Sequence, residues 1–221
     1  MGIWFLIALI ILGIIFAINI YIYENSEFNK ITNYSLLNIW NNGKVKKLYK
    51  VAQSLKRLQG EKKVLFNVIL PNKEKIDAIV ISESGVHVID IIDMNGWIYG
   101  REQDPEWAQA LFQSKNLNTF NNPIIDSKKR ILVLREILKI ENKELFHSII
   151  LFSNGCTIKK VDIQSENVAV MNVKNLKQYW SNKHGEQLKT DEINKIYSSL
   201  EPFMEIKKES KSSSMNQTAT N

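Results

Sequence analysis

The chain has 221 residues, of which 44% are hydrophobic and 24% charged, and its formal net charge is +6. Its single cysteine, Cys156, excludes an intrachain disulfide, and its three histidines are too far apart in the sequence to form a local zinc-binding motif. Residues 44–63 contain eight Lys or Arg and one Glu, a net charge of +7, so the rest of the chain is nearly neutral. The basic character of the protein therefore comes from one local patch.

An unbroken apolar stretch runs from Ile3 to Tyr23. As a helix, these residues would extend about 31 Å, which is the thickness of a hydrocarbon core. A cleaved signal peptide would have a basic n-region and a cleavage site of small residues. No Lys or Arg precedes this stretch, however, and it ends in Ile-Tyr-Ile-Tyr. We therefore predict an uncleaved, single-pass transmembrane anchor over residues 1–23.

Basic residues lie only on the C-terminal side of this anchor. Lys30 is the first, and the dense cluster begins at Lys44. Because cytoplasmic flanks carry an excess of Lys and Arg, we expect a cell-membrane protein with its soluble domain on the cytoplasmic side. The abundance of Ile, Asn and Lys is typical of a bacterium with AT-rich DNA.

The sequence after the anchor divides into a linker, one domain and a tail. Residues 24–42 are predicted to be a polar linker with some helical tendency, and residues 43–204 to be one α/β domain. The Ser- and Lys-rich residues 205–221 are expected to be disordered.

Hydrophobic periodicity gives the elements of this domain in chain order. An amphipathic helix is predicted over residues 45–59, where apolar residues recur at three- and four-residue steps. Three nearly continuous apolar strands are predicted to follow at 64–70, 75–82 and 86–93. The remaining predicted elements are a short strand at 97–99, a helix from a Ser127 cap to about Lys139, strands at 146–152 and 168–171, a short helix at 176–180, and a helix at 191–200 capped by Thr190. This order predicts a mixed sheet flanked by helices.

Two aspartates stand inside the apolar strands of this predicted sheet. Asp77 and Asp90 lie on either side of a tight turn at Ser84-Gly85, so a hairpin would bring them together. A buried carboxylate is costly unless it is paired, protonated or bound to a metal, and a divalent cation between two carboxylates removes their repulsion. A Mg²⁺ site is therefore one interpretation of the spacing. The alternative is that each aspartate sits at a strand end in contact with water.

The run from Lys75 to Gly100, KIDAIVISESGVHVIDIIDMNGWIYG, resembles the NERD (nuclease-related domain) family. The resemblance extends back to the helix at 45–59 and forward through Trp107 and Asn122-Pro123 to the next helix. It implies a restriction-endonuclease-like core of the PD-(D/E)xK type, built as a helix, a three-stranded β-meander, a helix, further strands and a C-terminal helix. It also implies that Asp77, Asp90 and the backbone carbonyl of Ile91 hold Mg²⁺ or Mn²⁺.

The sequence departs from this family pattern at three positions. Ile92 stands where the resemblance implies a catalytic lysine, so the donor that would stabilise charge at the scissile phosphate is lost. Gly43-Lys44 stands where the family usually has Gly-Glu, and Asp126 stands where it often has Gln. Lys128 or Lys129, on the following predicted helix, is a candidate to compensate for the missing lysine.

Two functions follow from this pattern. The first is a membrane-anchored, Mg²⁺-dependent nuclease with a degenerate site, in which cleavage of phosphodiester bonds is weak or lost. The second is a non-catalytic, membrane-tethered module that binds nucleic acid, anionic lipid or a partner protein. Ile92 favours the second, whereas the survival of both aspartates favours the first.

The basic predicted helix is the candidate surface for phosphate or lipid contact. Its cations could meet nucleic-acid phosphates or anionic headgroups, or could simply form a solvated face. The candidate residues are Lys46, Lys47, Lys50, Lys56 and Arg57.

Other notable side chains are expected to be structural. His87 precedes Asp90 by three residues on the same predicted strand and therefore faces the opposite side of the sheet. Trp97, Trp107 and Trp180 are expected to pack in the core or at its rim rather than to stack on bases.

Overall fold

The computed structural model describes residues 2–111 and 117–205. These residues divide into two compact units, an N-terminal unit that ends at Leu36 and a folded domain that begins at Leu37. The tail expected to be disordered lies outside the described residues from residue 206 onward.

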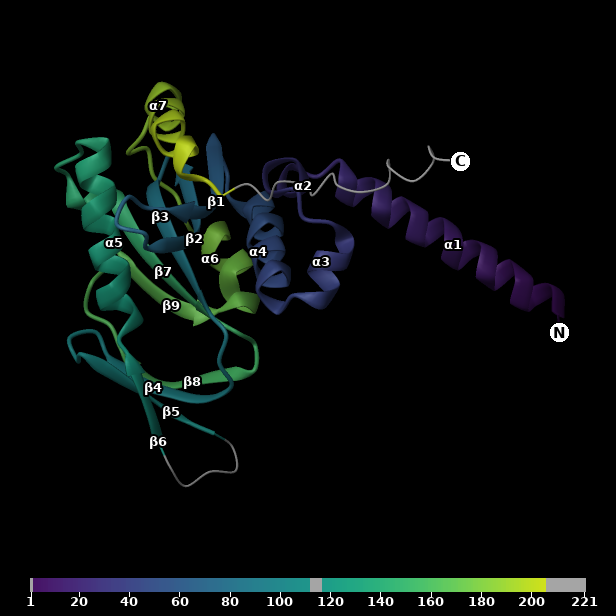
Figure 1. The fold of residues 1–221 in the computed structure, drawn as a ribbon, viewed down its shortest axis with the longest axis horizontal. Coiled ribbons are helices and arrows are strands. Elements are labelled where there is room, and N and C mark those ends of the chain that lie inside the picture. The colour runs from purple at the N-terminus through teal and green to yellow at the C-terminus, as the bar shows by residue number, and fades with distance from the viewer. Residues whose placement is uncertain (1, 112–116, 206–221) are drawn as a thin grey trace, which may run out of the picture. The chain divides into compact units, whose positions relative to one another are not determined.

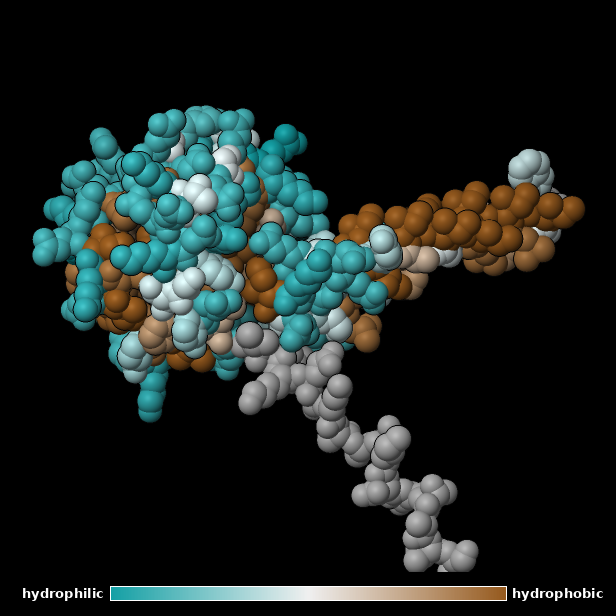
Figure 2. Space-filling model, turned by 90° about the horizontal axis from the view of Figure 1, so that it is seen from above, coloured by the Kyte–Doolittle hydropathy of each residue, from teal (hydrophilic) through white to brown (hydrophobic). Residues whose placement is uncertain are grey.

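The N-terminal unit contains the long apolar helix α1, Gly2–Glu24, and the short helix α2, Glu27–Thr32. Among the described residues, α1 is the one helix long and apolar enough to cross a membrane. Its apolar side chains are exposed, and Figure 2 shows it as a hydrophobic surface. α2 begins at the cap Ser26, whose Oγ accepts a hydrogen bond from the Asn29 N–H at 3.3 Å.

The predicted linker is more ordered than a polar spacer, because it contains α2 and the short helix α3, Leu36–Asn41. In the folded domain the helices of more than one turn are α4 (Gly43–Ser54), α5 (Pro123–Leu138), α6 (Leu176–Ser181) and α7 (Thr190–Leu200). Single 3₁₀ turns occupy η1 (Leu55–Arg57), η2 (Lys143–Leu145), η3 (Val173–Asn175) and η4 (Glu201–Phe203). The strands are β1 (Lys62–Ile69), β2 (Lys75–Ser82), β3 (Gly85–Ile92), β4 (Gly96–Arg101), β5 (Glu106–Ala110), β6 (Leu117–Asn121), β7 (Phe146–Phe152), β8 (Cys156–Asp162) and β9 (Val168–Asn172).

The main sheet has five strands in the order β1-β2-β3-β7-β9. The first three form an antiparallel meander, and β3, β7 and β9 are parallel. Nearly all of β2, β3 and β7 is buried, as expected for strands covered on both faces. The turn between β2 and β3 needs Gly85, which has a φ of 120° and whose Cβ would lie 2.5 Å from the Leu145 carbonyl oxygen.

Helices cover both faces of this sheet. On one face, α5 and α7 pack against the sheet through a cluster that includes Ile79, Val88, Leu134 and Ile193. α4 and α6 meet on the other side, where the Trp180 indole N–H donates to Ser54 Oγ at 3.0 Å. Figure 1 shows α5 running alongside β3 and β7, with α7 near one end of the sheet. The mixed α/β fold and its predicted order of elements are confirmed.

A second sheet of four strands has the order β6-β5-β4-β8 and lies below the main sheet in Figure 1. Three of its strands, β5, β6 and β8, were not predicted, because β5 and β6 are short and all three carry exposed polar side chains. Trp107, only 1% exposed, belongs to the apolar cluster beneath this sheet, and the centre of its ring lies 6.3 Å from that of Phe152. Trp107 and Trp180 are core residues as expected, and Trp97 is 38% exposed at the rim.

Two predicted helix caps are wrong. α5 begins at Pro123, capped by Asn122, and Ser127 is fully buried inside the helix. Thr190 is the first residue of α7 rather than its cap, because Lys189 precedes the helix and donates its N–H to Glu192 at 2.8 Å. α5 starts earlier than predicted because Pro123 is favourable at the first helical position. α7 starts earlier because the Glu192 side chain accepts from the backbone N–H of Lys189.

Asn122 holds together the region where α5 begins. Its Oδ1 accepts from the Ile124 N–H at 2.9 Å, and its Nδ2 donates to the carbonyls of Arg101, Glu102 and Asp104. We expect Asn122→Ala to lower the free energy of unfolding by about 2–4 kcal/mol, because it removes a cap and a donor to the buried carbonyl of Glu102. Urea unfolding of the full chain followed by tryptophan fluorescence measures this loss.

The matched control is Asn142→Ala, which removes the exposed cap of η2. It should cost less than about 1 kcal/mol. Equal losses in the two variants would contradict a special role for Asn122.

Candidate functional site

Asp77 and Asp90 lie on neighbouring strands at the same end of the β2–β3 pair. The last residues paired in register there are Ala78 and Ile89, so Asp77 and Asp90 are the next positions along their strands. Residues directly opposite in an antiparallel pair project to the same face of the sheet. The two residues are 8% and 7% exposed. The structure thus brings the two predicted acids together in a buried place.

Each oxygen of Asp77 already has a partner. Its Oδ1 lies 2.5 Å from the Nζ of Lys44, and its Oδ2 accepts a hydrogen bond from the Ile91 N–H at 2.7 Å. Lys44 is in the first turn of α4, where the Asn42 cap accepts from the Lys44 N–H at 3.0 Å. The resemblance implies that Ile91 acts through its carbonyl, whereas here it meets Asp77 through its N–H.

Asp90 faces a guanidinium instead of a lysine. Its Oδ2 lies 2.9 Å from Nη2 of Arg130 on α5, and Arg130 Nη1 lies 3.9 Å from Glu74. Burial raises the pKa of Asp90 above its ordinary value; Arg130 and Ser127 oppose this rise, and the charge of Asp77 adds to it. Among the residues that the structure describes, that Oδ2 accepts no hydrogen bond of normal geometry. Its charge is therefore balanced by Arg130 at ion-pair distance.

Ile92 stands at the position where the resemblance implies a lysine. It follows Asp90 by two residues and so projects to the same face of β3. Its partly buried side chain packs against the apolar cluster formed by Ile98, Trp107 and Phe152, with others. No charged group reaches the acidic pair from this position.

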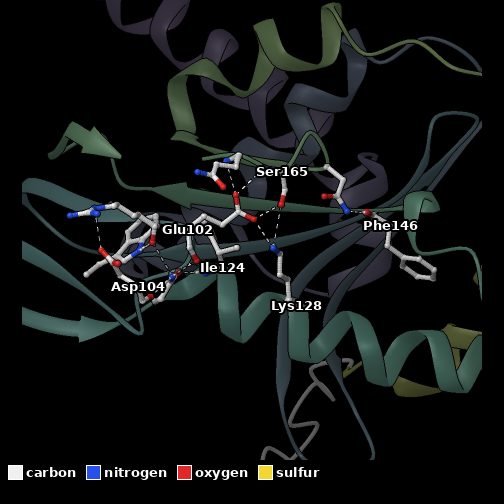
Figure 3. Close-up of polar contacts among 11 residues, drawn as sticks. Glu102, Asp104, Ile124, Lys128, Phe146 and Ser165 are labelled. Atoms are coloured by element: carbon white, nitrogen blue, oxygen red, sulfur yellow. Dashed lines mark hydrogen bonds and ion pairs between the residues drawn. The ribbon is translucent and has the colours of Figure 1, made fainter. Parts of the chain in front are cut away.

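Lys128 is committed to a different carboxylate, as Figure 3 shows. Its Nζ lies 2.6 Å from Glu102 Oε1 and 3.4 Å from Ser165 Oγ. Glu102 also accepts from Ser165 Oγ and from the N–H groups of Gln164 and Ser165, at 2.7 and 2.9 Å. Burial opposes ionisation of Glu102, but these hydrogen bonds outweigh it and lower its pKa to about 2. The cluster ties the end of β4 to α5 and to the segment before β9.

Lys129 is also engaged elsewhere, since its Nζ lies 3.3 Å from Asp126 on the same helix. The cation of α5 that meets the acidic pair is Arg130, which the sequence reasoning missed. Its position in the helix offered a signal, because a cation next to Ile131 and three residues after Ser127, both buried, lies close to the face that packs against the sheet. Lys44 was recognised as part of the basic patch and as a departure from the family's Gly-Glu, but not as a partner of Asp77.

A divalent cation does not fit between the two aspartates as they are arranged. Mg²⁺ requires several oxygen ligands in near-octahedral geometry, with water completing the shell. Lys44 and Arg130 occupy one oxygen of each aspartate, and the Ile91 N–H occupies another. Within the described ranges, no three His, Cys, Asp or Glu side chains are grouped closely enough to hold a metal.

The basic residues of α4 and η1 do not all face solvent. Lys47 has a side chain only 14% exposed, and its Nζ lies 2.6 Å from Asp93. The exposed members of the predicted contact surface are Lys46, Lys50, Lys56 and Arg57.

His87 lies within the domain as expected. It is fully buried, its Nε2 lies 3.0 Å from Ser84 Oγ, and its ring stacks on that of His147 at 4.7 Å. Burial lowers the pKa of both rings, that of His147 to about 4. Both rings are therefore neutral near pH 7.

Comparison with known proteins identifies the sequence class of this domain. The model of a family described as nuclease-related domain, NERD, matches residues 42–153. An uncharacterized protein of Bacillus anthracis is 32% identical over 126 residues, which are 57% of this chain and 58% of that protein. The chain thus aligns with less than two thirds of this relative's length. No solved structure matches the chain significantly.

The Glu102 cluster predicts a specific acid sensitivity. The pKa of Glu102 is lower in the folded state than its ordinary value of 4.5, so its stabilisation is complete above that pH and is lost as the pH falls toward 2. Between about pH 5 and about pH 3, the free energy of unfolding of the parent chain should therefore fall more steeply than that of Glu102→Gln, by about 1–3 kcal/mol. Urea titrations at several pH values measure the difference.

Glu106→Gln, which changes an exposed carboxylate on β5, is the matched control. It should follow the parent chain across this range. Parallel pH curves for the parent and Glu102→Gln would contradict the prediction.

Proposed function

Because this chain belongs to the nuclease-related domain (NERD) family, we propose that it is a membrane-anchored family member whose nuclease site is degenerate. In this proposal, Mg²⁺- or Mn²⁺-dependent cleavage of phosphodiester bonds is weak or lost. Asp77 and Asp90 are the remnants of the metal-binding acids, and α1 anchors the domain on the cytoplasmic side of the cell membrane.

The observation that carries the proposal is the environment of Ile92. A nuclease of this kind needs a cation near the scissile phosphate, and Ile92 instead packs into an apolar cluster. Removing one preorganised donor from a catalytic site typically costs two to three orders of magnitude in rate. Neither Lys128 nor Lys129 replaces it, since both bind other carboxylates.

The anchor rests on α1. Its length and its uniformly apolar, exposed surface suit a hydrocarbon environment, and the first basic residue follows it at Lys30. A single span would keep the domain next to the bilayer.

A cleavage assay tests the degenerate site. The full chain in detergent is incubated with single- and double-stranded DNA and RNA, with Mg²⁺ or Mn²⁺. We expect cleavage that is absent, or weak and abolished by Asp77→Ala. Robust cleavage by the parent chain that Asp77→Ala abolishes would overturn the proposal.

Ile92→Lys is the informative second variant, because it restores the missing cation. If the rest of the site is intact, cleavage should rise above that of the parent chain, provided that the variant keeps a cooperative urea transition. A folded variant without any gain would argue against the assignment of position 92.

A second candidate function, contact with anionic lipid, is favoured by exposed residues of α3 and α4. Leu37 and Trp40 are each 63% exposed and lie three residues apart on α3, and exposed Lys46 and Lys50 follow on α4. Apolar and basic side chains in this order suit an interface of headgroups and acyl chains.

Hydrogen exchange in nanodiscs tests this contact. We expect residues 43–57 of the full chain to be better protected in discs with phosphatidylglycerol than in discs of phosphatidylcholine alone, because each basic residue gains about 1 kcal/mol near an anionic surface. Lys46→Glu with Lys50→Glu should abolish the difference. The control pair Lys159→Glu with Lys160→Glu, on exposed β8, should leave it unchanged. Equal exchange in both discs would exclude the contact.

A further inference from the structure

We propose that Lys44 and Arg130 are built-in counter-cations that take the place of a divalent metal at Asp77 and Asp90. The inference deepens the proposed function, since it explains how the acidic pair persists in a degenerate site. It concerns metal binding and not cleavage, so the two proposals can fail separately.

The acidic pair needs a neutralising partner. Asp77 and Asp90 are both more than nine-tenths buried on adjacent strands, and two carboxylates in such a place repel each other. A buried carboxylate also loses its hydration unless a cation or several donors replace it. In a metal-dependent site, the divalent cation would meet both demands.

Here two protein cations meet them. Lys44 Nζ lies 2.5 Å from Asp77, and Arg130 Nη2 lies 2.9 Å from Asp90. Each aspartate is thus paired with one cation, and the partly exposed Glu74, 3.9 Å from Arg130 Nη1, adds one carboxylate at the edge of the group. A divalent cation would have to displace a cation already in contact with an aspartate.

The two counter-cations lie on helices that make further contacts with the domain. α4 carries a second ion pair, between Lys47 and the exposed Asp93 at 2.6 Å. Arg130 is only 15% exposed on its side chain, on the helix face next to Ile131 and Leu134. The cations thus arrive from two separate helices, α4 and α5, and each meets one aspartate.

The two counter-cations differ in how easily they can be removed. The Lys44 side chain is 53% exposed, so its loss opens Asp77 to solvent without leaving a cavity. Arg130 is buried, and its loss would leave Asp90 as an unpaired buried charge. Lys44 is therefore the position at which the inference can be tested with a folded protein.

The test is Mn²⁺ binding by the full chain in detergent, measured by the electron paramagnetic resonance signal of free Mn²⁺. For the parent chain, we expect no Mn²⁺ binding that depends on Asp77. At millimolar Mn²⁺, the parent chain and Asp77→Asn should therefore give the same signal. Lys44→Gln should bind Mn²⁺ at least about tenfold more tightly than the parent chain does. The reason is that it frees one carboxylate oxygen and leaves the group with a net negative charge. The gain should vanish in Lys44→Gln combined with Asp77→Asn.

Two controls separate this effect from a general change in charge. Lys47→Gln removes the same charge one turn further along α4, where the partner is the exposed Asp93, and should give no gain. Lys44→Arg keeps a cation at Asp77 and should also give none. The inference is overturned if the parent chain binds Mn²⁺ in an Asp77-dependent manner, or if Lys44→Gln gains no more than Lys47→Gln. Either result leaves the cleavage assay, and so the degenerate nuclease, as a separate question.

Discussion

The pairing of β2 with β3 sets the constraint on which the candidate site depends. The register of this hairpin brings Asp77 and Asp90 to adjacent positions inside the sheet, where neither is well hydrated. Ionised carboxylates in such a place must be balanced by cations, and the rest of the domain supplies Lys44 and Arg130. The first turn of α4 and the middle of α5 each supply one cation to the acidic pair.

Much of the fold could be predicted from the sequence. The strands of the meander and β7 are nearly continuous apolar runs, so their ends were found within a few residues. β5 and β6 are short, and β8 has polar, exposed residues at most of its positions, so the periodicity of all three is too weak to recognise. The caps at Asn122 and Lys189 were missed because Ser127 and Thr190 resemble ordinary cap residues.

The candidate site was predictable in part. Asp77 and Asp90 were found because a charged residue in an apolar strand requires an explanation. Their partners were not found, because pairing across separate helices depends on tertiary packing that sequence spacing does not show. Lys128 illustrates the same limit. It lies on the expected helix, yet its ammonium group pairs with the buried Glu102 and not with the acidic pair. Lys44, which stands where the family pattern usually has Glu, acquires a specific partner only in the folded domain.

The packing of Ile92 couples the candidate site to the second sheet. This side chain is partly buried against the apolar cluster that includes Ile98 of β4, Trp107 of β5 and Phe152 of β7. A lysine in its place would leave only its aliphatic stem in this cluster and would have to carry its ammonium group out of it. Chemistry at position 92 and the packing of the smaller sheet are therefore not independent, and a substitution there changes both.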